Sequence, residues 1–235
     1  MIGSIIRIGL RIVLVLVLAV LLLVPLYAYV PPVSTVMIGR WLTGKPVTRI
    51  WKPLEQISPN LVRAVIAAED ARFCSHAGVD WVEVGHALED ADDVEGLRGA
   101  STIAMQTAKN LFLWPGRQFI RKGLEVPLAY YLNLMWTKRR LIEVYLNVAE
   151  WGPNGEFGAE AGARRAFHKS AANLLPSEAA LLAAVLPNPK LRNAARPGPG
   201  LLRASIRYRR LAAGAGPPIT ACSARGGGPQ PFVCG

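Results

Sequence analysis

The sequence predicts a mainly α-helical protein with one transmembrane helix at its N-terminus. Of its 235 residues, 51% are hydrophobic, and the apolar excess lies at the N-terminus rather than along the whole chain. From residue 58 to residue 210, apolar residues recur at helical spacing, with Gly and Pro between the periodic segments. No segment alternates apolar and polar residues as a half-buried strand does. A chain of this length supports one sizeable core, so we expect a single domain plus its anchor.

Residues 12–30 carry no charge and are mostly Leu and Val. As a helix rising about 1.5 Å per residue, this segment reaches roughly the thickness of a bilayer's hydrocarbon core. Arg7 and Arg11 precede it, which favours a cytoplasmic N-terminus over residues 1–11. A cleaved signal peptide is the alternative, but the apolar run is longer than an ordinary signal core and no small-residue cleavage site follows it. We therefore expect a retained, single-pass anchor.

The chain carries a formal net charge of +11. Nucleic acid or an anionic membrane surface with its phosphorylated lipids would each account for that charge, and the anchor favours the membrane. The three cysteines, Cys74, Cys222 and Cys234, lack the spacing of metal ligands, so we expect no metal site. A disulfide between Cys222 and Cys234 is left open by the sequence.

Three regions follow the anchor. Residues 31–57 hold turn residues and scattered basic groups and are predicted to be a juxtamembrane linker. Residues 58–212 form the expected helical domain, and its first helix has Ser58 as N-cap and Pro59 at the first helical position. Residues 213–235 are rich in Gly and Pro and predict a flexible tail. Further helices are predicted over residues 102–113, 118–136, 138–149, 158–168 and 177–186.

The first group of polar residues ends the helix that starts at Ser58. Glu69 follows Val65 by four residues, so it lies at the edge of the helix's apolar face. Partial desolvation there raises the pKa of a carboxyl group and suits it to proton transfer near neutral pH. The alternative is that Glu69 and Asp70 simply end a helix in water. His76, taken alone, is more often structural than catalytic.

The second group opens the next predicted helix. Thr102, Gln106 and Lys109 occur at i, i+4 and i+7, so one face would present a hydroxyl, an amide and an ammonium to a sugar and a phosphate. Residues 99–101, Gly-Ala-Ser, allow close backbone approach at a helix N-terminus, which favours an anion. An ordinary solvated helix face explains the same pattern equally well.

The third group is Arg121, Lys122 and Glu125. Arg121 and Glu125 are one helical turn apart, and a surface ion pair worth a few tenths of a kcal/mol is the simple alternative. Pro127 predicts a kink or a break just beyond them. Two carboxylates with cations between them suit sugar transfer from a phosphate donor, in which one group deprotonates the attacking hydroxyl and the cations stabilise the departing pyrophosphate. The same carboxylates would equally suit a glycosidase.

In these motifs the chain resembles the peptidoglycan glycosyltransferase family, whose domain also occurs in class A penicillin-binding proteins, and more closely its monofunctional branch. The resemblance covers about residues 54–197. The matching residues are Glu69, Asp70, Phe73, His76 and Gly78; Gly99 to Ile103 with Gln106, Lys109 and Asn110; Arg121, Lys122 and Glu125; Lys138 with Tyr145 to Asn147; Gly158 to Glu160 with Phe167; and Ser177 to Pro189. It departs from the common pattern at Ala194, which follows Asn193 where Pro is usual, at Cys74, and in the acidic run of residues 89–95.

The resemblance implies a lysozyme-like helical lobe and a small membrane-proximal lobe with a cleft between donor and acceptor subsites. It implies that Glu69 is the general base acting on the acceptor 4-hydroxyl and that Glu125 is the second catalytic carboxylate. Substrate-binding roles are implied for Asp70, Phe73, His76, Ser101, Thr102, Gln106, Lys109, Asn110, Arg121 and Lys122.

The implied reaction joins lipid II to a growing lipid-linked glycan chain through β-1,4 bonds and releases undecaprenyl diphosphate. No cofactor is required, and a divalent cation, Mg or Mn, is an optional aid to the pyrophosphate. The expected location is the bacterial inner membrane with the catalytic domain on the periplasmic side. The expected partners are that membrane and proteins of cell division or cell-wall synthesis, and no nucleic acid. Only a short tail follows Leu211, so we expect no transpeptidase activity.

Two other functions remain as alternatives. A cell-wall hydrolase or lytic transglycosylase shares the helical lobe and a catalytic glutamate, but cleavage of a glycosidic bond needs no cationic site for pyrophosphate. A membrane-tethered scaffold that only binds glycan or division proteins would not need both glutamates. The set of Thr102, Gln106, Lys109 and Arg121 therefore argues against the hydrolase, and the presence of both glutamates argues against the scaffold.

Overall fold

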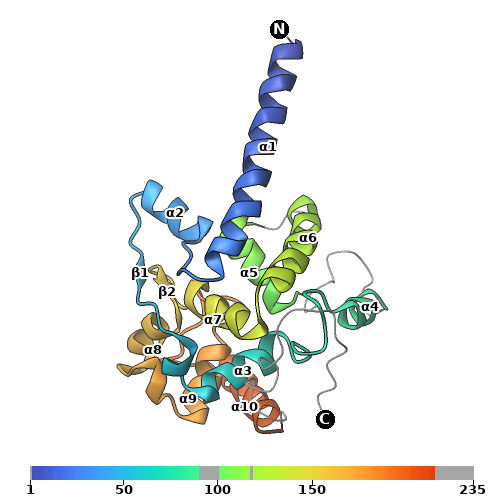
Figure 1. Ribbon diagram of the computed structural model, residues 1–235. Helices are drawn as coiled ribbons and strands as arrows, with labels where there is room; N and C mark the ends of the chain where they lie inside the picture. Colours follow the sequence, from blue (N-terminus) through green and yellow to red (C-terminus); the bar gives the residue numbers. More distant parts are fainter. Residues whose placement is uncertain (1, 90–100, 117–118, 215–235) are drawn as a thin grey trace.

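The computed structural model describes residues 2–89, 101–116 and 119–214, and these are mainly helical, as predicted (Figure 1). In chain order the elements are α1 (Ile2–Tyr27), α2 (Thr35–Leu42), β1 (Thr48–Arg49), a 3-10 turn (Leu54–Gln56), α3 (Pro59–Glu69), α4 (Trp81–Glu89), α5 (Ile103–Phe112), α6 (Phe119–Met135), α7 (Lys138–Val148), β2 (Glu156–Phe157), α8 (Ala159–Phe167), a second 3-10 turn (Ala171–Asn173), α9 (Pro176–Ala183) and α10 (Pro199–Gly214).

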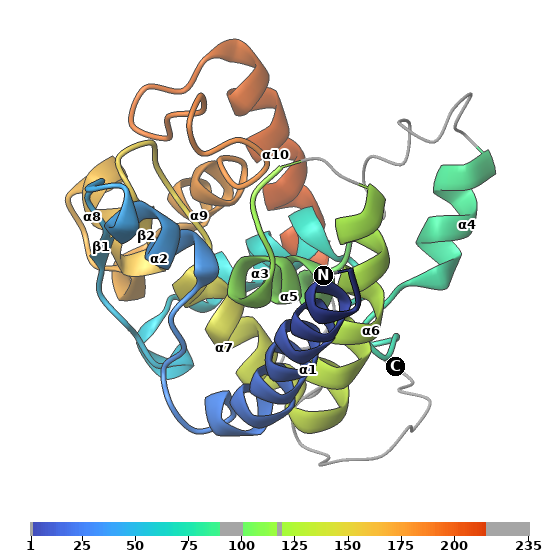
Figure 2. The same cartoon turned by 90° about the horizontal axis from the view of Figure 1, so that it is seen from above.

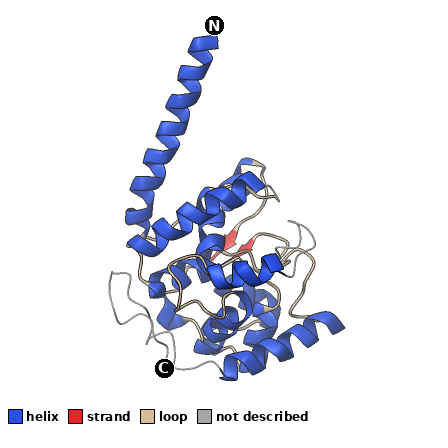
Figure 3. Ribbon diagram, turned by 90° about the vertical axis from the view of Figure 1, so that its right-hand side faces the viewer, coloured by secondary structure: helices blue, strands red, loops and turns tan. Residues whose placement is uncertain are grey.

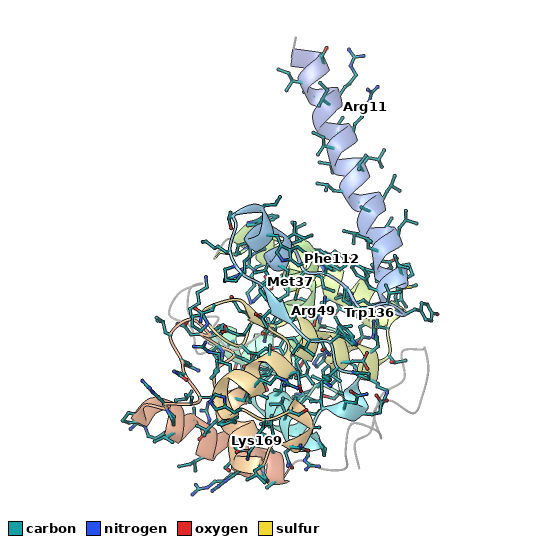
Figure 4. The ribbon with its side chains drawn as sticks, turned by 90° about the vertical axis from the view of Figure 1, so that its left-hand side faces the viewer. Arg11, Met37, Arg49, Phe112, Trp136 and Lys169 are labelled. Carbon is teal, nitrogen blue, oxygen red and sulfur yellow. The ribbon has the colours of Figure 1, made fainter. Side chains whose placement is uncertain are left out.

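The helix α1 projects away from the rest of the molecule (Figure 1). By length and composition, its residues Ser4–Tyr27 could cross a membrane, which fits the expected anchor. Seen along the anchor, α2 and α6 lie on either side of its foot (Figure 2). The helix begins at Ile2 rather than at the predicted residue 12, because residues 2–11, which include Arg7 and Arg11, continue the same helical backbone. The charged end of α1, marked by Arg11, is its far end (Figure 4).

The core lies between helices that are distant in the sequence. The helix α5 packs between α6 and α7, while α3 packs against α9 and both contact α10. The helices α3, α5, α7 and α9 contribute fully buried aliphatic side chains, including Leu61, Ile103, Leu141 and Leu182. Burial of such a side chain stabilises the fold by about 1.5–3 kcal/mol. Because α3 and α5 both belong to this core, the polar residues at their ends have fixed positions.

Two very short strands, red in Figure 3, lie at the left-hand side of the domain in Figure 1. They pair in parallel, Thr48 with Glu156 and Arg49 with Phe157. No strand was predicted from the sequence, and that prediction is wrong for these residues. Two-residue strands are too short to show an alternating pattern, so their pairing arises from the tertiary structure.

The predicted helices of the domain are present, with ends shifted by a few residues. Thr102 and Leu113, predicted as the ends of one helix, are the caps of α5. The helix α9 ends at Ala183 rather than at the predicted residue 186, where Pro187 disfavours helical backbone in the residue before it. Of the kink or break predicted at Pro127, the break does not occur, because α6 continues through this residue to Met135.

Three helices were not predicted, namely α2, α4 and α10. The expected linker of residues 31–57 therefore contains a helix, whose N-cap Ser34 accepts a hydrogen bond from the Met37 N–H at 3.1 Å. Cys74 is disulfide-bonded. The pairing considered for Cys222 with Cys234, the acidic run from residue 90 on, and the tail from residue 215 on lie outside the described residues.

Candidate active site

Glu69 is the last residue of α3. The helix starts as predicted, with the Ser58 hydroxyl accepting from the Asn60 N–H, and Leu61 and Val65 turn its apolar face into the core. Glu69 is only partly exposed, and its Oε2 accepts a hydrogen bond from Gln106 Nε2 at 2.8 Å. Burial raises the pKa of the Glu69 carboxyl group above its ordinary value, and the Gln106 hydrogen bond opposes that change. The prediction of a partly desolvated carboxyl group at this helix end is confirmed.

The Gln106 side chain is held by Tyr145, a motif residue that was quoted from the sequence without a role. The Tyr145 hydroxyl, from α7, donates to Gln106 Oε1 at 3.0 Å. Tyr145 is fully buried, and burial together with the charges of Glu69 and Asp70 raises the pKa of its phenol well above 10. Tyr145 therefore remains a hydrogen-bond donor. Its bond directs the amide nitrogen of Gln106 toward Glu69.

Asp70 joins α3 to the start of α5. Its Oδ2 accepts the Ile103 N–H at 2.9 Å, and its Oδ1 lies 2.8 Å from His76 Nε2. His76 Nδ1 accepts the Gly78 N–H at 3.2 Å, so the proton of the ring lies on Nε2 and faces the carboxylate. An anion was predicted at the N-terminus of α5, and the anion found there is the carboxylate of Asp70 itself. Asp70 and His76 thus support the site from within the protein.

Thr102 has a structural role at the same place. Its hydroxyl donates to the Gly78 carbonyl oxygen at 2.5 Å and accepts the Met105 N–H at 3.2 Å, and the residue is buried. The predicted face of Thr102, Gln106 and Lys109 is therefore incomplete, because the Thr102 hydroxyl is already used as the cap of α5.

The residue that accepts the Thr102 hydroxyl, Gly78, can only be glycine. It has φ of 110°, and a Cβ there would meet the Ala129 carbonyl oxygen at 2.6 Å.

The helix α6 supplies the remaining charged residues. Arg121 and Glu125 form an ion pair in which the two residues are only 9% and 3% exposed, so the pair is buried rather than on the surface. Arg121 Nε also donates to the Gly116 carbonyl oxygen at 2.9 Å. Lys122 Nζ donates to the Ser101 hydroxyl, which links α6 to the segment before α5. The second and third predicted groups of polar residues are therefore in contact, through Ser101 and Lys122.

Lys109 lies among these groups. Burial is the main cause that lowers the pKa of the Lys109 ammonium, and the positive charge of Arg121 lowers it further. The negative charges of Glu125 and Glu69 oppose this change and raise the pKa. These mutual effects show that the two glutamates and the cations share one electrostatic environment. Asn110, the next residue, joins α2 through its carbonyl oxygen, which accepts from Thr35 Oγ1 at 3.1 Å.

Lys138 is a further cation that the sequence analysis quoted without giving it a role. Its Nζ donates to the His76 carbonyl oxygen at 2.7 Å and lies 4.7 Å from the centre of the Phe73 ring. Burial lowers the pKa of Lys138 to about 8, and Asp70 partly opposes this change. Phe73 is fully buried under the ammonium, so it supports the site rather than facing a ligand.

A small cavity opens beside Glu69. Its volume is about 180 Å³, and it is lined by residues that include Glu69, Arg72, Glu83 and Ser101. Pockets for drug-sized ligands hold about 300–1,000 Å³, so this cavity fits only part of a sugar chain. Arg192 approaches from the segment after α9: its Nη1 donates to the Ala184 carbonyl oxygen at 2.7 Å, and its charge lowers the pKa of Glu69. Nothing in the sequence pattern pointed to Arg192.

Known proteins that are similar to this chain belong to one family. A family model described as transglycosylase matches residues 35–211. The chain is 54% identical to the biosynthetic peptidoglycan transglycosylase of Rhodopseudomonas palustris over 204 residues, which cover 86% of this chain and 90% of that protein. It is 48% identical to the protein of the same name from Brucella suis biovar 1 over 220 residues, which cover 93% of this chain and 98% of that protein.

Proposed function

Because the chain belongs to the transglycosylase family, we propose that it is a peptidoglycan glycosyltransferase that polymerises lipid II into β-1,4-linked glycan strands. The observation that supports this most directly is the half-buried Glu69 carboxyl group with its raised pKa, close to a group of cations. A base and a cationic site are the two parts that sugar transfer from a pyrophosphate donor requires.

Glu69 acts as the general base. It accepts the proton of the acceptor 4-hydroxyl as the hydroxyl oxygen attacks the anomeric carbon of the lipid-linked donor chain. The bond between that carbon and the pyrophosphate oxygen breaks, and its electron pair leaves with undecaprenyl diphosphate. Attack from the face opposite the leaving group inverts the anomeric carbon and gives the β linkage. The hydrogen bond from Gln106 keeps the Glu69 carboxyl group in one orientation for this step.

The departing pyrophosphate gains negative charge as the bond breaks. Lys109 and Lys122 offer ammonium groups for that charge, and the charges of Arg121 and Lys122 both act on Lys109. Glu125 holds the Arg121 guanidinium through the buried ion pair. The preorganised cations stabilise the transition state without moving during the reaction. Glu125 therefore positions a cation, while Glu69 transfers the proton.

The apolar helix α1 is proposed to anchor the chain in the inner membrane, with residues 31–214 on the periplasmic side. Protease added to spheroplasts should then digest the catalytic domain and leave a tag at the N-terminus intact. Digestion of the tag with protection of the domain would reverse the proposed orientation.

The test of the reaction is polymerisation of labelled lipid II by the purified full chain in detergent. We expect polymer from the native chain and a loss of at least 100-fold in Glu69→Gln, since general-base catalysis contributes about 10²–10⁴-fold. The matched control is Glu83→Gln, which removes an exposed carboxylate from the same cavity. Cleavage of preformed glycan without any polymerisation would favour a lytic enzyme and overturn the proposal.

A further inference from the structure

The last two turns of α1 contain three backbone carbonyl groups without a backbone donor. A helical carbonyl normally accepts the N–H four residues later. For Leu21 that residue is Pro25, and for Tyr27 it is Pro31; proline has no N–H. For Val24 it is Ala28, whose N–H bonds to the Pro25 carbonyl oxygen instead. Unpaired carbonyls are costly, above all near a membrane, where water is scarce.

Each of these carbonyls accepts a hydrogen bond from a side chain of α6 or of the α6–α7 region that follows. The Tyr131 hydroxyl donates to the Leu21 oxygen at 2.9 Å, and Trp136 Nε1 donates to the Val24 oxygen at 2.7 Å. Arg140 Nε and Nη2 both donate to the Tyr27 oxygen, at 3.1 and 2.9 Å. Residues 21, 24 and 27 are three apart, so they lie on one face of the helix.

Arg140 extends the contact past the end of the helix. Its Nη2 also donates to the Val30 carbonyl oxygen at 2.7 Å. The chain therefore remains attached to α7 as it leaves the anchor. One guanidinium thus holds two carbonyl groups, at the last helical residue and three residues beyond it, which fixes the direction of the connection to α2.

Apolar packing follows the same face. Val24 is fully buried, whereas Leu22, two residues earlier, is 72% exposed. The Tyr27 ring stacks on Phe112 of α5, with centroids 6.2 Å apart and planes at 20°. Trp136 lies at the foot of the anchor (Figure 4). The anchor is thus exposed along most of its length and docked on the domain only at its exit.

We propose that the exit turns of α1 are a structural part of the catalytic domain, docked on α6 and α7 so that the cationic end of α6 has a fixed height and orientation above the bilayer. The proposal rests on the proposed function, in which Lys122 and Arg121 of α6 meet a pyrophosphate whose lipid tail remains in the membrane. Tyr131 and these cations belong to one helix, so docking of its C-terminal half orients its N-terminal half.

A double-mutant cycle tests the docking separately from the activity. In the full chain in detergent, Tyr131→Phe should lower the midpoint of thermal unfolding by about 2–4 °C. In a Pro25→Ala background the Leu21 carbonyl regains a backbone donor, so Tyr131→Phe should change the midpoint much less. The matched control is Tyr130→Phe, which loses only the bond from Trp81 Nε1 and should act equally in both backgrounds. Equal effects of Tyr131→Phe in the two backgrounds would overturn the docking.

The consequence for activity is tested in vesicles with lipid II. We expect the double variant Tyr131→Phe with Arg140→Gln to polymerise about tenfold more slowly than the native chain in vesicles. In detergent, where there is no bilayer for the cationic end of α6 to be positioned against, the rate of the double variant should be close to that of the native chain. Arg139→Gln, which removes a neighbouring surface charge, is the control for Arg140.

Unchanged rates of the double variant in vesicles, alongside an active native chain, would overturn the positioning role. An inactive native chain would instead refute the proposed function and leave the unfolding cycle to decide the docking.

Discussion

Tyr145 donates a hydrogen bond to Gln106 across 3.0 Å, and this bond decides which end of the Gln106 amide faces the Glu69 carboxyl group. An amide can present either oxygen or nitrogen, and only nitrogen stabilises an ionised carboxylate. The buried phenol therefore controls the proton affinity of Glu69 without touching it. If Glu69 is the base, as proposed, Tyr145 is a positioning residue for it.

Tyr145→Phe should lower kcat for polymerisation about tenfold, because loss of one buried hydrogen bond costs about 1–2 kcal/mol. The freed amide can turn its oxygen toward Glu69, which raises the pKa of that carboxyl group. The acidic limb of the pH–rate profile should then move to higher pH. Tyr29→Phe, at a residue that is 87% exposed, is the control. A lower rate with an unmoved acidic limb would show that Tyr145 acts only through stability.

The raised pKa of Glu69 predicts opposite effects on stability and on activity. The folded state holds the proton of this carboxyl group more tightly than the unfolded chain, so stability is lost as pH rises from the unfolded value of about 4.5 through the raised folded value. Glu69→Gln should therefore unfold at a higher temperature than the native chain at pH 7, and the difference should shrink toward pH 4. Polymerisation needs the ionised base, so the native activity should fall over the range in which stability grows. A variant less stable than the native chain at pH 7 would contradict this explanation.

The buried Arg121–Glu125 pair predicts a large cost for losing one partner. Glu125→Gln leaves a guanidinium that is 90% shielded without its counter-charge, and breaking such a pair costs about 3–5 kcal/mol of stability. The exposed pair of Arg139 with Glu55 is the internal comparison, and Glu55→Gln should cost no more than about 1 kcal/mol. Urea unfolding of the two variants measures both values. Equal costs would mean that the Arg121–Glu125 pair is solvated in solution.

The sequence predicted the residues of this site better than their contacts. Ser58 and Pro59 mark the start of α3 by local chemistry alone, and the position of Glu69 on that helix follows from its spacing. The bond of Tyr145 to Gln106 joins residues 39 apart, and that of Asp70 to Ile103 joins residues 33 apart. No local pattern carries such information, because it depends on how α3, α5 and α7 pack.

Local signals also failed where tertiary contacts prevail. Pro127 indicated a kink or a break, and no break occurs in α6, because its packing against α5 and α1 outweighs one missing backbone bond. Thr102 was read as part of a binding face, but its hydroxyl is used as the cap of α5. The resemblance supplied Lys138 as a motif residue, and only the structure shows what its ammonium contacts.

The last prediction concerns that ammonium. The pKa of Lys138 in the folded state is about 8, below the 10.5 of the unfolded chain, so the unfolded state binds more protons between these values. The stability of the native chain should therefore rise, relative to Lys138→Met, as pH increases from 8 to 10.5, and the difference should stay constant between pH 6 and 7. Arg139→Gln changes a neighbouring exposed charge and controls for general effects of alkaline pH. Urea unfolding at each pH gives the difference directly. A difference that is flat up to pH 10.5 would mean that the ammonium is hydrated in solution, and that its contact with Phe73 and the His76 carbonyl does not hold it out of water.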